Sequence, residues 1–201
     1  MTFRATTVFF AAMFASQVAL TAVSFADGKK GKDGSTEIRF RADLDPVPLP
    51  DVDNIGDGKA HYKKKTGKKG TEEKFKGKVE FPILDIATAD DAVFEMHLAR
   101  LGVDYAVCLL RIKEIEFKYQ PGNPVPVGIE AEYVVDVSQR TPLSGTPKLT
   151  EKVGSCTALD GTTHLVPAVQ EMDTATVFQQ GSPSTLLSGT FLANSDHDDH
   201  D

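Results

Sequence analysis

The chain contains no tryptophan, two cysteines and five histidines among its 201 residues. It also lacks the short signatures of common enzymes, such as Gly-x-Ser-x-Gly, His-Glu-x-x-His, a phosphate-binding glycine loop or a Cys/His catalytic pattern. Without tryptophan there is no indole surface on which a sugar ring stacks. Two cysteines without nearby histidines cannot fill a tetrahedral zinc site. These absences favour a protein that is not an enzyme.

Residues 1–26 have the layout of a secretory signal peptide. Arg4 precedes a mostly apolar run at residues 8–23, small residues stand at Ser24 and Ala26, and the chain then turns polar. Sixteen residues with polar interruptions are too few to cross a bilayer comfortably. The sequence therefore predicts cleavage, a secreted or periplasmic protein, and no membrane span after cleavage.

Apolar and polar residues alternate with a period of two through the centre of the chain. The pattern begins at Ile38, Phe40 and Ala42 and returns at residues 74–83 and 129–137. Because turn residues separate these segments and no long helix is indicated, we expect an all-β fold, an antiparallel β-sandwich of about nine strands.

The domain organisation follows from composition. We expect a flexible linker at residues 27–36, a single β-sandwich domain at 37–193, and a disordered acidic and histidine-bearing tail at 194–201. In residues 105–119 the apolar parity changes between Ile112 and Ile115, which predicts a β-bulge near Lys113.

Cys108 and Cys156 form an even pair in a chain that is expected to be exported. In an oxidising compartment such a pair predicts one disulfide bond. The alternative is two buried free thiols.

A cluster of lysines is the most unusual local feature. Between Lys59 and Lys78 there are nine lysines and two glutamates, in a chain whose net charge is −7. A turn at residues 66–70 is placed to close a hairpin between residues 59–65 and 73–83. His61 and alternate lysines then share one face, which we expect to bind an anionic polysaccharide or an acidic protein; these lysines are Lys63, Lys65, Lys74, Lys76 and Lys78.

The alternative reading of this cluster is a solvated hairpin whose lysines protect an exposed edge from aggregation. Nucleic acid is not the expected partner, because the segment has no arginine and its only aromatic residues are Tyr62 and Phe75.

Two further sets of acidic residues suggest other functions. Asp51, Asp53 and Asp57 lie in a glycine-bearing loop that offers oxygen ligands for calcium, as in a calcium-dependent extracellular adhesion module. The loop departs from an EF-hand, and an ordinary Asx-rich turn is the alternative.

The second set consists of the pairs Glu114/Glu116 and Glu130/Glu132, each on one side of a strand. Paired carboxylates would be needed for an unrecognised hydrolase site, whereas the alternative is a solvent-facing stripe. His97, on a predicted strand, is expected to be a hydrogen-bonded structural residue.

The segment Phe40-Arg41-Ala42-Asp43-Leu44-Asp45-Pro46-Val47-Pro48-Leu49-Pro50, followed by Gly58-Lys59-Ala60, resembles the opening of the CHRD domain family. His97-Leu98 is similar to part of that family's His-Ile-His element. The resemblance covers residues 38–100, and the chain lacks the family's Glu-Val-Pro-Pro sequence and second histidine. It implies a secreted, CHRD-like β-sandwich with a role in extracellular binding and no established catalysis.

Overall fold

The structure of the chain is a computed structural model. The residues that it describes are 29–30, 34–48, 56–83, 86, 89, 92–163 and 165–193. Three features expected from the sequence fall outside these ranges: the signal peptide at 1–26, Asp51 and Asp53 of the calcium loop, and the tail at 194–201. Half of the linker expected at 27–36 is also outside them, while Lys29 and Lys30 pair with the start of the next strand.

The described chain is built from β-strands. The longest two strands, β6 and β7, have 17 and 16 residues. The strands are β1 (Lys29–Lys30), β2 (Thr36–Pro46), β3 (Asp57–Gly67), β4 (Gly70–Ile83), β5 (Phe94–Arg100), β6 (Val103–Tyr119), β7 (Pro126–Thr141), β8 (Lys148–Val153), β9 (Ser155–Ala158), β10 (Thr174–Gln179), β11 (Thr185–Thr190) and β12 (Leu192–Ala193).

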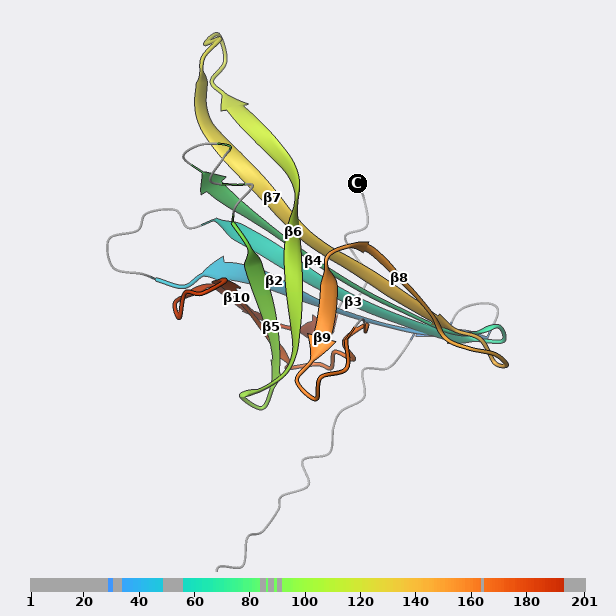
Figure 1. Cartoon of the computed structure of the whole chain (residues 1–201). Helices are drawn as coiled ribbons and strands as arrows, with labels where there is room; N and C mark the ends of the chain where they lie inside the picture. The colour runs from blue at the N-terminus through green and yellow to red at the C-terminus, as the bar shows by residue number, and fades with distance from the viewer. Residues whose placement is uncertain are drawn as a thin grey trace, which may run out of the picture.

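Eight of these strands close into an antiparallel barrel (Figure 1). Their order is β7-β4-β3-β2-β11-β10-β5-β6, and β6 pairs with β7 to complete the circuit. The expected β-sandwich is therefore wrong, both as an Ig-like and as a CHRD-like arrangement. The physical reason is that a sandwich and a barrel both bury one face of each strand, so the same period of two serves either architecture.

Closure depends on β6, which changes its neighbour part of the way along. Residues 103–110 of β6 pair with β5, and residues 111–119 pair with β7. The register with β7 shifts between Ile112 and Glu114, so the predicted bulge near Lys113 is confirmed. A bulge increases local twist and bends a strand, which lets β6 leave the barrel wall and follow β7.

The short strands β8 and β9 fill the fork that opens where β6 and β7 diverge. β8 pairs with residues 136–140 of β7, whereas β9 pairs with residues 106–109 of β6. Gly154 joins them with a φ of +65°, and a Cβ at this position would lie 2.3 Å from the carbonyl oxygen of Leu109. The turn between the two strands therefore requires glycine.

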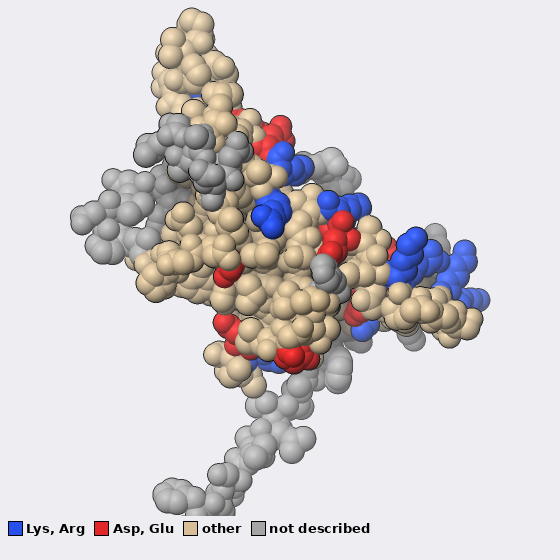
Figure 2. Space-filling model, in the orientation of Figure 1, with Lys and Arg blue, Asp and Glu red and all other residues tan. Residues whose placement is uncertain are grey.

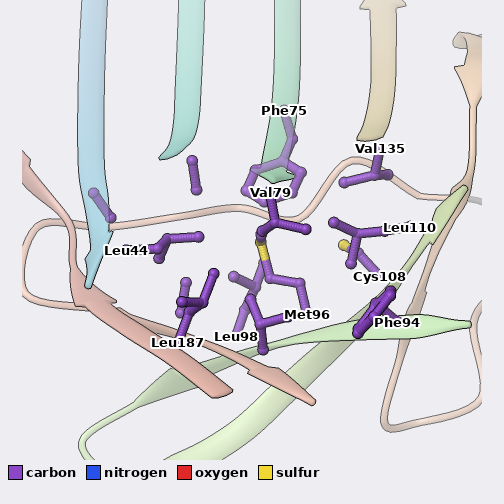
Figure 3. Packing of buried hydrophobic residues seen from close by; sticks show 14 of the residues in the cluster. Leu44, Phe75, Val79, Phe94, Met96, Leu98, Cys108, Leu110, Val135 and Leu187 are labelled. Carbon is purple, nitrogen blue, oxygen red and sulfur yellow. The ribbon is translucent and has the colours of Figure 1, made fainter. Parts of the chain in front are cut away.

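Side chains from all sides fill the interior of the barrel (Figure 3). Phe94 stacks on Phe81 with ring centroids 4.5 Å apart and meets the edge of Tyr133 at 4.6 Å. Met96 packs against Gly77 so closely that a Cβ there would lie 2.8 Å from the Met96 Cε atom. The centre of the barrel is thus a packed core.

Cys108 and Cys156 form the expected disulfide, which staples β9 to β6. The two residues are direct cross-strand partners with Cα atoms 4.0 Å apart, and both are fully buried. Disulfides are typical of proteins from oxidising compartments.

An ion pair between Arg100 and the buried carboxylate of Asp173 anchors the segment before β10 to the β5–β6 hairpin. Asp173 is 1% exposed and accepts hydrogen bonds from Arg100 Nε and Nη2, each at 2.9 Å. The hydroxyl of Tyr105 and the backbone N–H of Gln170 also donate to it, at 3.0 and 2.8 Å. Burial and the Asp173 carboxylate raise the pKa of Tyr105, so its phenol remains a donor. This arrangement satisfies the buried charge and is structural.

Removing the disulfide will destabilise the barrel. The bond closes a loop with a sequence separation of 48 residues. Loop-closure entropy for this length is worth about 4 kcal/mol, so Cys108→Ala/Cys156→Ala should lower the free energy of unfolding in urea by roughly 2–5 kcal/mol. A loss of unfolding free energy below about 1 kcal/mol would contradict the stabilising role of this disulfide.

Alanine at Gly154 will be costlier than alanine at another glycine of similar φ. Gly161 has a φ of +88° and no atom within 4 Å of the place that a Cβ would occupy, so Gly161→Ala measures the conformational penalty alone. Gly154→Ala adds the clash with Leu109, and we expect it to cost roughly 1–3 kcal/mol more in thermal or urea unfolding. Equal losses of unfolding free energy in the two variants would show that the turn between β8 and β9 tolerates a side chain.

Candidate functional site

The register of β3 and β4 places the lysines of the predicted hairpin opposite one another. Lys63 faces Lys74 and His61 faces Lys76 across the strands. Lys65, by contrast, faces Glu72. The hairpin itself forms as the sequence predicts, with its turn at Lys68 and Lys69.

Strand β2 adds two arginines that sequence reasoning did not assign to this surface. Arg39 lies opposite Lys63, and Arg41 lies opposite His61. We call the outer face of these three strands the cationic wall; it comprises Arg39, Arg41, Lys59, His61, Lys63, Lys74, Lys76 and Lys78. The alternation of β2 was visible in the sequence, but its pairing with β3 was not.

Acidic residues on β2, β4 and β7 compensate much of the wall. Glu37 of β2 contacts Lys63 at 3.0 Å, and Asp136 of β7 lies 3.4 Å from Lys74. Lys78 contacts Glu80 at 2.6 Å and Glu132 at 3.0 Å. Three of the five lysines predicted to bind anions therefore form ion pairs with carboxylates of the same chain. Lys65 and Lys76 form no ion pair with any described residue.

The pKa values of the acidic partners agree with this compensation. Partial burial raises the pKa of Glu37, but hydrogen bonds from Lys63 and Arg39 outweigh it and lower the pKa. The pKa of Glu132 is lowered in the same way, because hydrogen bonds from Lys113 and Lys78 overcome the effect of burial. Both carboxylates are ionised at neutral pH and hold the lysines beside them.

Uncompensated positive charge gathers at the end of the barrel where the β3–β4 turn lies. Lys65, Lys68 and Lys69 are exposed there, and strand pairing brings Arg140 of β7 and Lys148 of β8 to the same end. Figure 2 shows this concentration of basic side chains. We call these five residues the distal cationic cluster; none of them makes an ion pair with the described part of the chain.

Sequence reasoning missed Arg140 and Lys148, because they lie about 70 residues beyond the hairpin and join it only through the order β3-β4-β7-β8. Across these strands Lys65, Glu72, Arg140 and Lys148 form one row. Glu72 stands within that row, and Glu37 of β2 lies opposite Lys65 at its other end.

His61 lies within the cationic wall, between Arg41 and Lys76. Partial burial of the imidazole and the nearby charges of Arg41, Lys59 and Lys76 lower the pKa of His61, while Asp43 acts in the opposite direction. His61 is therefore neutral at pH 7 and gains its charge only in acid.

The structure brings together little of the predicted calcium site. Asp51 and Asp53 lie outside the described residues, and Asp57 is exposed at the start of β3 opposite Glu80. Within the described ranges, no group of three or more histidine, cysteine, aspartate or glutamate side chains is arranged to hold a metal ion.

The paired glutamates meet across β6 and β7. Glu114 lies opposite Glu132, and Glu116 lies opposite Glu130. Lys113 contacts Glu132 at 2.9 Å, while Lys118 contacts Glu130 at 2.9 Å and Glu116 at 3.1 Å. This is a charged stripe in which lysines accompany the carboxylates, and Glu132 within it is buried.

His97 has the hydrogen-bonded environment expected for a structural histidine. Its Nδ1 atom lies 2.9 Å from Asp104 Oδ2, and its ring meets the ring of Phe178 at 4.8 Å.

Comparisons with known protein families, with curated proteins and with solved structures found no match for this chain. The CHRD resemblance therefore stays a prediction. Among the described residues, no helix has the length and apolar character needed to traverse a membrane.

The titration of His61 predicts a pH-dependent stability. Its pKa in the folded protein lies below the unfolded value of 6.5, so protonation favours the unfolded chain. The free energy of unfolding should fall as the pH drops from 7 through the folded-state pKa, and above pH 7 this group should have no effect on the slope. In His61→Gln that part of the decline should disappear, as measured by urea unfolding between pH 8 and pH 5. Parallel profiles for the two proteins would contradict this assignment.

Proposed function

We propose that this protein is a secreted or periplasmic, non-enzymatic binding module that contacts anionic polymers, such as acidic polysaccharides. The signal-peptide layout of residues 1–26 supports export. The disulfide between Cys108 and Cys156 is consistent with an oxidising destination.

The observation that carries this proposal is the distal cationic cluster. Five exposed basic residues from three strands and the β3–β4 turn occupy one end of the barrel, without a described acidic partner in ion-pair contact. The whole chain is nevertheless acidic, with a net charge of −7. Positive charge that is concentrated in this way steers a polyanion to one place on an otherwise repelling surface.

The rigidity of the cluster also supports the proposal. Lys65, Arg140 and Lys148 stand on paired strands, so their Cα positions are fixed before a ligand arrives. Lys63, Lys74 and Lys76 continue the surface along the cationic wall, where the ligand would compete with Glu37 and Asp136. We therefore assign the main anion contacts to the distal cationic cluster and a secondary contribution to the wall.

Neutralising the cluster should weaken polyanion binding. Lys65→Gln/Lys68→Gln/Lys69→Gln should lower affinity for heparin, used as a model polyanion. Since the variant makes fewer contacts and binding then releases fewer counterions, the slope of log K against log salt should fall by roughly 2–3. Isothermal titration calorimetry at several salt concentrations measures both quantities.

A matched control removes the same charge from compensated lysines. Lys64→Gln/Lys113→Gln/Lys118→Gln has the same net charge as the cluster variant, but each of these lysines already contacts a carboxylate and none belongs to the cluster or the wall. Its affinity should stay close to that of the wild type. If both triple variants lose affinity equally, net charge decides binding and the assigned surface is wrong; if the wild type does not bind heparin, the proposal fails.

A further inference from the structure

A two-stranded arm extends from the barrel at the end opposite the distal cationic cluster (Figure 1). It consists of residues 114–119 of β6 and 126–132 of β7, and we call it the β6–β7 arm. β4 accompanies β7 only as far as the pair Ile83–Ile129, and β5 accompanies β6 only as far as the pair Phe94–Leu110. β4 thus runs beside residues 129–132 of the arm, whereas residues 126–128 of β7 and residues 114–119 of β6 have a strand on one side only among the described residues.

One face of the arm is apolar and is exposed toward its tip, whereas Ile115 nearer the barrel packs partly against the core. Ile115, Phe117 and Tyr119 continue the inward-facing side of β6, and Val127 and Ile129 lie on the adjoining strand. Phe117 is 43% exposed, Tyr119 57% and Val127 53%. In Figure 2 the end of the arm shows almost no charged atoms. Large apolar side chains that stand together in water favour association with another surface.

The outer edge of β6 along the arm is also unpaired among the described strands. Residues 111–119 pair with β7 on one side only, since β5 ends at the level of Leu110. Proteins commonly protect such an edge with lysines. Here the charge of Lys118 is already engaged by Glu116 and Glu130, at 3.1 and 2.9 Å, so it offers little repulsion.

We propose that this edge pairs with the same edge of a second copy of the chain, in antiparallel orientation about a two-fold axis at Phe117. In this register, Glu116 lies opposite Lys118 of the partner subunit, and Lys118 lies opposite Glu116 of the partner subunit. On the other face, Ile115 meets Tyr119 of the partner subunit, and the two Phe117 side chains lie side by side. In this register, the apolar face of one copy meets the apolar face of the other, and the charged faces of the two copies bring opposite charges together.

Charge selects this register over its neighbours. An axis at Glu116 sets Glu114 opposite Lys118 of the partner subunit but also places two Glu116 side chains opposite each other, and an axis at Lys118 places two lysines opposite each other. Like charges in directly opposed positions destabilise a strand pair, whereas opposite charges stabilise it. The axis at Phe117 has two opposite-charge pairs and no like-charge pair, which is the argument for a second copy as the occupant. This pairing is independent of polyanion binding.

Sedimentation-velocity measurements over a concentration series test the pairing with the chain that lacks residues 1–26, which retains every described residue. The wild type should associate to a dimer. Glu116→Lys should weaken the dimer by roughly tenfold, because two attractive pairs become repulsive. The variant should still fold, since the introduced lysine faces Glu130 within its own subunit. Glu116→Lys/Lys118→Glu restores opposite charges and should return the affinity to within about threefold of the wild type.

Glu114→Lys is the matched control. It makes the same substitution on the same face of β6, two residues away, but the proposed register places position 114 opposite Gln120 of the partner subunit. Its dimer should dissociate like that of the wild type. Circular dichroism and thermal melting verify folding of each variant. A wild type that stays monomeric at every concentration overturns the proposal, and so does an equal effect of Glu114→Lys and Glu116→Lys or a failure of the charge swap to restore association.

Discussion

The barrel depends on one strand serving two neighbours. The first part of β6 completes the wall beside β5, and its second part pairs with β7 from Arg111 onward, with the bulge at Lys113 near the start of that second part. Without that change of partner, the sheet would keep two open edges. The change also opens a fork, which β8 and β9 fill, so Gly154 and the disulfide between Cys108 and Cys156 follow from the same geometry.

Closure also decides where charge is free and where it is compensated. By bringing β2 and β7 beside the lysine hairpin, it sets Glu37 and Asp136 next to Lys63 and Lys74. The middle of the cationic wall is therefore largely neutralised, and cations without a described ion-pair partner remain at the end of the barrel. A dense run of lysines in a sequence is thus a poor measure of the field at the surface, which depends on the strands that flank it.

Local patterns were enough to predict several elements. The bulge near Lys113, the turn at residues 66–70 and the structural role of His97 each rest on a few neighbouring residues, because side-chain alternation and turn chemistry are local properties. The ion pair between Arg100 and Asp173 joins residues 73 positions apart, and the sequence around either residue does not predict the other as its partner. Arg140 and Lys148 were missed at the candidate site for the same reason, since only the strand order places them beside Lys65.

The sequence by itself determined the strands, their buried faces and the cysteine pair, because a strand with one wet face must alternate and an isolated pair of cysteines has one way to bond. The tertiary structure decided that the sheet closes into a barrel, that the free cations gather at one end, and that the β6–β7 arm extends beyond its neighbours. These outcomes depend on the order and register of strands, which arise from contacts between distant segments, whereas alternation within a strand is the same in a sandwich and in a barrel.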